Sequence, residues 1–182
     1  MNTNTNTNTN TKKLVQASLL LAMSIIFQII GRNIPQINQF LVGPIINCIL
    51  VLTAFICGKW WGIGVGILTP ILAWLVGQLA TPLAPFIPFI IIGNFIFVFL
   101  LSLFMKGQLL KRGIGIVIGA IGKYAFLTFA STKLINLLGL NFPPNVVKAL
   151  SISMSTPQLI TALVGGAFAL IISEALIKRK VI

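Results

Sequence analysis

Few side chains in this sequence have the chemistry that catalysis requires. The chain has no histidine, and Glu174 is its one acidic residue. General acid–base catalysis, nucleophilic catalysis and metal binding all need acids, histidines or activated cysteines grouped together. Cys48 and Cys57 lie in one apolar run, where we expect them to pack as small apolar groups. We therefore predict that the chain is not an enzyme and holds neither a metal ion nor a cofactor.

The best candidates for function are polar side chains inside long apolar runs. The sharpest is Lys123, about ten residues into its apolar run. A charged side chain near the middle of a membrane costs about 2.5–3.5 kcal/mol on insertion scales. Lys123 either faces a cavity and meets an anionic group of a ligand, or extends toward the cytoplasm, or pairs with Glu174. The sequence leaves these interpretations open.

Several other side chains are candidates for the same site. Amides such as Asn94 and Gln158 either bond a neighbouring helix or contact polar edges of a ligand, and for Asn47 we expect the helix contact. Basic residues near the outer surface either make the mouth of a cavity electropositive or anchor helices. The basic candidates are Arg32, Lys133 and Lys148. Thr128 lies on the same helix face as Lys123, and Trp74 either lines the site or packs between helices.

The composition indicates the class of protein in which these residues lie. Of 182 residues, 57% are hydrophobic and 8% are charged, whereas a soluble domain has roughly 25% charged residues. Lipid must therefore be the outer solvent. The basic residues that give the net charge of +12 lie mostly between apolar runs. The sequence has no basic face with interleaved aromatic residues, which nucleic-acid binding would need.

The apolar runs predict an all-α membrane protein with about six transmembrane helices in a single domain, residues 12–182. A polar Asn-Thr repeat at 1–11 precedes it and is expected to be disordered. We expect 79–88, with three prolines, to be a loop or a broken helix start, and 146–154 to be a short interfacial segment. The expected spans are 14–30, 40–57, 60–78, 86–105, 113–138 and 156–177.

The basic residues predict the orientation. With the N-terminus inside, nearly all of them fall on the cytoplasmic side, whereas Arg32 and Lys148 fall outside. The positive-inside rule then gives a multi-pass protein of the cell membrane with both termini cytoplasmic. The residues on the cytoplasmic side are Lys12, Lys13, Lys59, Lys106, Lys111, Arg112, Lys178, Arg179 and Lys180.

Size, span number and several short stretches give the chain a resemblance to a known family. The stretches are GPIIN at 43–47, GIGVGILTP at 62–70, IGN at 92–94, GKYAF at 122–126, and Gln158 followed by Gly165 and Gly166. With these features the chain resembles the substrate-binding S-components of energy-coupling factor (ECF) vitamin transporters over about residues 12–180.

The resemblance implies a mechanism and partners. An S-component captures a vitamin or related micronutrient in an outward cavity, docks onto a transmembrane coupling subunit and topples in the membrane. Two ATPase subunits use ATP, which fits a chain without a G-x-x-x-x-G-K-[ST] motif. Docking uses small residues on the first helix, typically Ala-x-x-x-Ala. The corresponding residues are Ala17, Ser18 and Ala22, with Ser18-x-x-x-Ala22 departing from that motif.

The basic candidates favour a ligand with a carboxylate or a phosphate. Three other classes of protein remain as alternatives. A stand-alone transporter or channel would work without ATPase partners, and an assembly subunit would bind no small molecule. A membrane-embedded enzyme of lipid metabolism would need acids or histidines that this sequence lacks.

Overall fold

The computed structural model describes residues 3–34, 38–140 and 142–179. Within these ranges every regular element is helical and no strand occurs, which confirms the all-helical prediction. The long helices are α1 (Thr3–Arg32), α2 (Asn38–Cys57), α3 (Lys59–Leu75), α4 (Ile87–Ser102), α5 (Leu109–Phe129) and α8 (Thr156–Lys178). The short elements are a 3-10 helix η1 (Thr81–Phe86), a π-helical turn η2 (Ala130–Leu134), α6 (Ile135–Leu137) and α7 (Pro144–Ser153).

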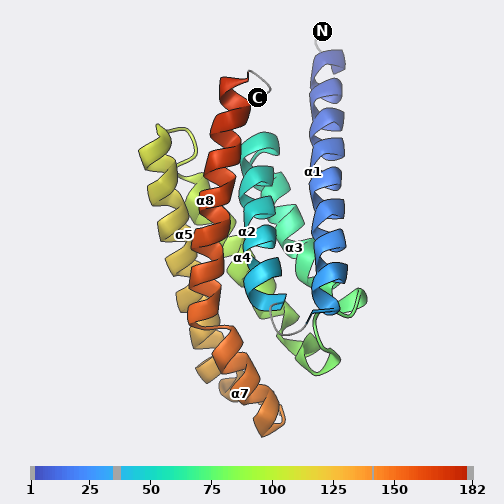
Figure 1. Ribbon diagram of the computed structural model, residues 1–182, viewed down its shortest axis with the longest axis vertical. Helices are drawn as coiled ribbons and strands as arrows, with labels where there is room; N and C mark the ends of the chain where they lie inside the picture. The colour runs from blue at the N-terminus through green and yellow to red at the C-terminus, as the bar shows by residue number, and fades with distance from the viewer. Residues whose placement is uncertain (1–2, 35–37, 141, 180–182) are drawn as a thin grey trace.

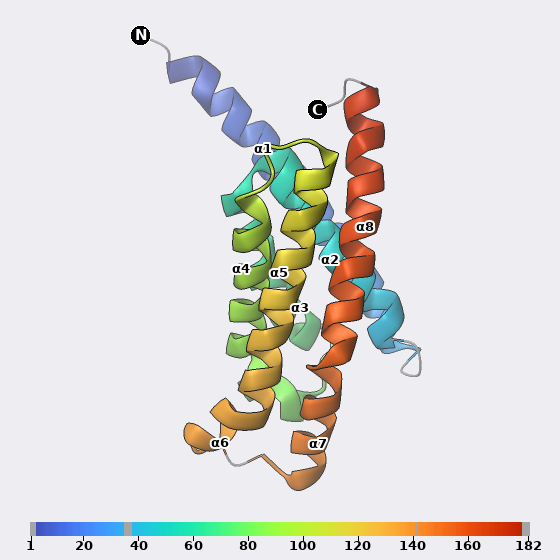
Figure 2. The same ribbon diagram turned by 90° about the vertical axis from the view of Figure 1, so that its left-hand side faces the viewer.

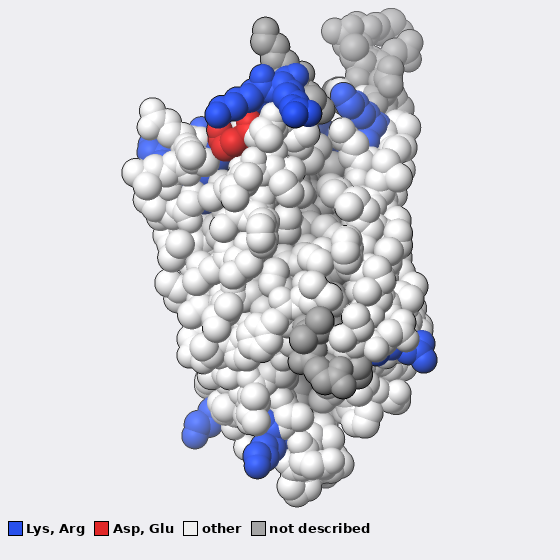
Figure 3. Space-filling view, viewed as in Figure 1, with Lys and Arg blue, Asp and Glu red and all other residues white. Residues whose placement is uncertain are grey.

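The helices have the length and the surface of membrane spans. Five helical stretches in the described residues are long and apolar enough to cross a membrane: Thr9–Arg32, Gln39–Cys57, Thr81–Ser102, Leu109–Leu137 and Pro144–Lys178. The sixth apolar helix, α3, has 17 residues and is therefore about 26 Å long. A broad uncharged band separates the two charged ends of the molecule (Figure 3). These features agree with the predicted number of about six spans.

Five of the six long helices, α2, α3, α4, α5 and α8, pack into a closed ring. α2 contacts α1, α3 and α8; α4 contacts α3 and α5; and α5 contacts α8. The helix α1 packs against this ring through its contacts with α2 and α3. Figures 1 and 2 show α4, α5 and α8 running close to the long axis of the molecule, while α1 crosses the bundle obliquely in Figure 2; both termini lie at the same end.

The contact between α2 and α8 requires glycine. A Cβ atom added at Gly165 of α8 would overlap the carbonyl oxygen of Pro44 and lie 2.8 Å from the backbone nitrogen of Cys48, both on α2. Small residues let helix backbones approach closely in membranes. Gly165 therefore allows α8 to lie against the backbone of α2, which brings the polar residues at the start of both helices together.

Three segments add to the sequence expectations or depart from them. First, α1 begins at Thr3, so residues 3–11 of the polar repeat continue the helix, whereas residues 1–2 lie outside the described part. An existing helix adds one hydrogen bond for each further residue, so its extension costs less than its nucleation. Second, 79–88 contains the 3-10 helix η1 directly before α4, which agrees with the expected broken helix start. Third, the expected span 113–138 is divided by the π-helical turn η2.

Basic residues gather toward the end that carries the termini (Figure 3). The opposite end carries fewer, namely Arg32, Lys133 and Lys148, and Lys123 lies within the bundle. Lys180 lies outside the described residues. At the end with the termini the described basic residues are Lys12, Lys13, Lys59, Lys106, Lys111, Arg112, Lys178 and Arg179.

Candidate functional site

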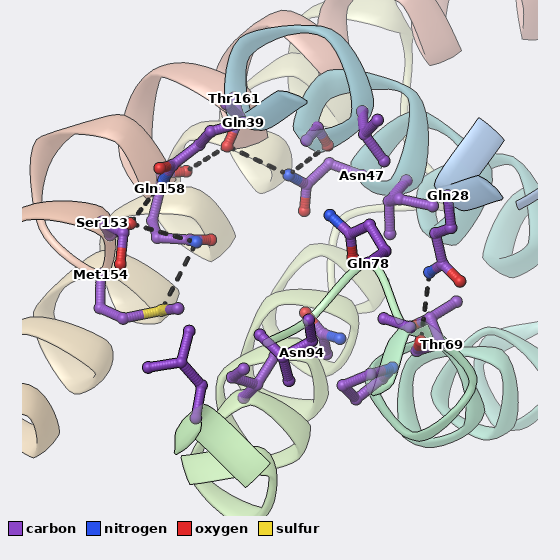
Figure 4. A pocket seen from close by; sticks show the side chains of 18 of the residues that line it. Gln28, Gln39, Asn47, Thr69, Gln78, Asn94, Ser153, Met154, Gln158 and Thr161 are labelled. Atoms are coloured by element: carbon purple, nitrogen blue, oxygen red, sulfur yellow. Dashed lines mark hydrogen bonds between the residues drawn. The ribbon is translucent and has the colours of Figure 1, made fainter. Parts of the chain in front are cut away.

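A cavity of about 310 Å³ lies in the half of the bundle away from the termini. Its wall comes from the last turns of α1 and α3, the segment 78–83 that includes part of η1, the first turns of α2, α4 and α8, the middle of α5 and the end of α7. Figure 4 shows Asn47, Asn94 and Gln158 on three sides of this space. The polar lining residues are Gln28, Gln39, Asn47, Thr69, Gln78, Asn94, Lys123, Ser153, Gln158 and Thr161.

Lys123 reaches the cavity wall as part of a hydrogen-bonded chain through three helices. Its Nζ on α5 donates to Oδ1 of Asn47 on α2 over 2.8 Å. The Nδ2 of Asn47 donates to the carbonyl oxygen of Gly43 at 2.9 Å and to Oγ1 of Thr161 on α8 at 3.4 Å. The amide of Asn47 is thereby oriented with its oxygen toward the ammonium group. Asn47 therefore does more than join helices, because it also positions Lys123.

The ammonium group of Lys123 has only neutral partners in the described residues. Lys123 is 4% exposed, and its Nζ also lies 5.6 Å from the ring centre of Phe97. Glu174, the one acidic residue of the sequence, pairs with Arg112 at 2.9 Å. The two sequence alternatives for Lys123, pairing with Glu174 and extension out of the bundle, therefore do not match its position. A buried charge without a counter-charge is the feature that an anionic ligand would compensate.

Asn94 has a structural contact that explains its position. Pro70 inside α3 has no N–H group, so the carbonyl oxygen of Gly66, four residues earlier, lacks its usual helical donor. Nδ2 of Asn94 donates to this oxygen over 2.9 Å. The amide nitrogen thus joins α4 to α3 through one of its two N–H groups, and Asn94 can offer its amide oxygen and the second N–H group to a ligand.

Two glutamines join the α7 end to the rest of the wall. Ser153 ends α7, and the residue four positions later is Pro157, which cannot donate to its carbonyl oxygen. Nε2 of Gln39 donates to that oxygen at 2.6 Å and Nε2 of Gln158 at 3.4 Å. The same nitrogen of Gln158 lies 3.6 Å from the sulfur of Met154. These contacts fix α7 against α2 and α8 at the cavity.

Gln28 contributes a polar group from α1. Its Nε2 donates to the carbonyl oxygen of Thr69 over 3.1 Å, and the side chain is 2% exposed. Among the described residues, its Oε1 is the buried side-chain polar atom without a hydrogen-bond partner. A buried acceptor without a donor costs about 1–3 kcal/mol. The α1 side of the wall therefore holds an unsatisfied acceptor beside the cavity.

The other predicted ligand residues lie outside the cavity wall. Arg32 is exposed and donates to the carbonyl oxygen of Val76 at 3.1 Å, which ties the ends of α1 and α3 together. Lys133 is exposed on η2, and Trp74 is 39% exposed beside the lining residue Ala73. Thr128 contacts the carbonyl oxygen of Met154 at 3.4 Å and supports the wall from behind.

The residues predicted for docking divide between the core and the surface. Ala17 is 4% exposed and packs in the core. Ser18 and Ala22 are exposed on α1. Because successive helical residues point about 100° apart, Ala17 and Ser18 cannot share one outer face. The exposed small pair is therefore Ser18 and Ala22.

Sequence reasoning missed six polar residues in the wall, namely Gln28, Gln39, Thr69, Gln78, Ser153 and Thr161, although a signal existed for some of them. Gln28 is an amide inside an apolar run, the same pattern that singled out Asn94. Thr69 precedes an interior proline, and Thr161 lies one turn after Gln158. Gln39 and Ser153 stand at helix ends, where polar residues are common, so they gave no signal.

Comparison with known protein families identifies the family of this chain. The family described as the ECF transporter, substrate-specific component, matches residues 12–177. This match confirms the resemblance predicted from the sequence, and a transporter component agrees with the prediction that the chain is not an enzyme. No curated protein and no solved structure matches the chain. The chain belongs to the family of ECF transporter substrate-specific components.

Proposed function

We propose that this chain captures a vitamin or related micronutrient from outside the cell and delivers it as part of an ECF importer. The observation that carries the proposal is the cavity around Lys123, which combines one buried ammonium group with several amides in a chain of this family. Ligand sites are concave and mostly apolar, with a small number of placed polar groups. The volume of about 310 Å³ lies at the small end of the range for ligand pockets.

The direction of capture follows from the distribution of charge. Basic residues gather at the end with the termini, and the positive-inside rule makes that end cytoplasmic. The cavity lies in the opposite half of the bundle and therefore faces outside. Both termini are then in the cytoplasm of a multi-pass protein of the cell membrane.

The charge of the cavity favours a ligand with one negative charge. Lys123 is the one charged residue among the described residues that line it. A carboxylate would neutralise the ammonium group, whereas a dianion would leave a buried negative charge and a cation would be repelled. The amides of Asn94, Gln39 and Gln158 surround the neutral body of such a ligand.

The partners follow from the family. A transmembrane coupling subunit docks against the exposed pair Ser18 and Ala22 on α1, and two ATPase subunits use ATP. In this arrangement the chain itself needs no nucleotide. Its part is to bind the substrate and to present it to the coupling subunit.

Purification of the tagged chain from its native membranes tests this function. The proposal predicts that a coupling subunit and two ATPase subunits co-purify in mild detergent. Bulky substitution of both docking residues, Ser18→Leu with Ala22→Leu, should remove these partners while the protein stays folded. Ile26→Leu, an exposed position on the same helix, serves as the control. A wild-type chain that never retains ATPase subunits would instead be a stand-alone transporter or channel.

A further inference from the structure

A second cavity lies at the end of the bundle that carries the termini. Its volume is about 590 Å³, and the ends of α2, α3, α4, α5 and α8 surround it. Three lining residues are basic, namely Lys59, Lys106 and Arg112. The cavity is remote from Lys123 and shares no lining residue with the candidate substrate site.

One of the three basic side chains is fixed in place. Arg112 donates from Nη1 to Glu174 at 2.9 Å and from Nε to the carbonyl oxygen of Gly107 at 3.0 Å, and its guanidinium lies 5.6 Å from the ring centre of Phe55. Glu174 balances the charge of Arg112. Lys59 and Lys106 are exposed and add two positive charges that no acidic side chain of the sequence can balance.

The cavity lies where a membrane presents its headgroups. Nζ of Lys59 sits 5.0 Å from the ring centre of Trp60, and Trp60 is 68% exposed. Tryptophan and lysine side by side at the end of an apolar helix are typical of the membrane–water interface. The helix α3 also begins at Lys59 without a side-chain cap, so its first amide groups favour an anion.

The lining indicates which part of a lipid each group would contact. The hydroxyls of Ser102 and Ser173 donate to carbonyl oxygens of their own helices, at 2.6 and 2.9 Å. The lysines are therefore the donors for phosphate oxygens. Phe55, Met105 and Ile177 add an apolar wall that suits the carbon atoms of a lipid.

We propose that this cavity binds the phosphodiester headgroup of an anionic phospholipid, with Lys59 and Lys106 contacting the phosphate. The ligand is an anionic lipid because a zwitterionic headgroup would bring its own ammonium group close to the two lysines. Basic pockets between helices on the cytoplasmic side recognise headgroups in this way. This site is independent of the proposed substrate function.

The matched variants separate a pocket from a diffuse field of positive charge. Lys59→Gln with Lys106→Gln removes two charges inside the cavity. Lys111→Gln with Lys178→Gln removes two charges from exposed residues at the same end that do not line it. If the lysines act only through a diffuse positive field, both double variants should lose the same affinity for anionic lipid. If they form a pocket, only Lys59→Gln with Lys106→Gln should lose it.

Lipid binding by the full chain in detergent, measured with native mass spectrometry, tests the proposal. Phosphatidylglycerol and phosphatidylcholine with identical acyl chains are the probes, and inorganic phosphate is the competitor. We expect tighter binding of phosphatidylglycerol, a loss of about thirtyfold in Lys59→Gln/Lys106→Gln, and little change in the control pair. Thermal unfolding checks that both double variants are folded.

Three results would overturn the proposal. Equal losses in the two double variants would show a diffuse field. Displacement of the lipid by inorganic phosphate would show a site for free phosphate. A Lys59→Gln/Lys106→Gln protein that retains phosphatidylglycerol but no longer binds its coupling subunit would show that the cavity serves a protein partner.

Discussion

At the residue scale, Lys123 and Asn47 determine what the cavity can bind. Nζ of Lys123 is held at 2.8 Å from an amide oxygen rather than from a carboxylate. The protein thus orients the positive charge without neutralising it. An amide partner preserves the attraction to an anionic ligand, which an acidic partner would cancel.

Replacement of Lys123 by Gln should weaken the binding of an anionic ligand by at least about thirtyfold, because truncating one partner of a buried charge pair costs about 2–5 kcal/mol. The same change should raise the unfolding temperature of the empty protein, since it removes a buried charge without a counter-charge. Titration of tryptophan fluorescence gives the affinity. Lys133→Gln, an exposed residue outside the wall, is the control, and equal affinities in the two variants would contradict the assignment.

Replacement of Asn47 by Asp should also reduce the affinity for an anion, by a different route. The new carboxylate would lie beside Nζ of Lys123 and take the place of the ligand's charge. Asn136→Asp is the matched control, because this side chain is exposed and outside the wall. Both variants are compared by isothermal titration. If Asn47→Asp binds the anion as tightly as the wild type, the ligand's charge does not meet Lys123.

The sequence identified some wall residues and not others for a physical reason. Lys123, Asn94 and Gln158 were predicted candidates that the structure brings to one cavity, and their contact with a ligand stays a prediction. Polarity inside an apolar run marks a side chain as unusual but does not give the rotation of its helix. Trp74 and Ala73 are neighbours in sequence, yet only Ala73 lines the cavity. Helix rotation depends on packing between distant segments.

At the element scale, the close approach of α2 and α8 holds the two sides of the cavity together. Replacement of Gly165 by Ala should lower the unfolding temperature in detergent, because the new methyl group would overlap the backbone of α2. Overpacking of this kind costs about 1–3 kcal/mol. Gly64→Ala makes the same chemical change where no atom lies within 4 Å, so it should be tolerated. Equal unfolding temperatures would show that α8 can move away from α2 without cost.

The length of the apolar runs predicted the positions of the helices well. It did not predict the local geometry within them. The expected spans 40–57 and 156–177 correspond to α2 (Asn38–Cys57) and α8 (Thr156–Lys178). Ser155-Thr156-Pro157 indicated the start of the last span, and Gly58 followed by Lys59 indicated the end of the second. No pattern marked the π-helical turn η2, because an extra residue in one turn leaves the composition of the segment unchanged.

At the scale of the whole molecule, the proposed orientation has a direct test. Cysteine is introduced at Leu138, an exposed residue at the cavity end, or at Arg179, an exposed residue at the opposite end. The native Cys48 and Cys57 are buried and provide a low background. A membrane-impermeant thiol reagent should label Leu138→Cys in intact cells and Arg179→Cys only after permeabilisation. The reverse pattern would place the cavity on the cytoplasmic side.

The central claim is that the cavity around Lys123 captures a small anionic molecule without help from ATP. Mass spectrometry of small molecules released from the protein, purified in mild detergent, tests this claim most directly. We predict one molecule per protein, with a single carboxylate, that is absent from the Lys123→Gln variant purified in parallel. A wild-type protein that carries no such molecule and binds none from a panel of vitamins would contradict the claim.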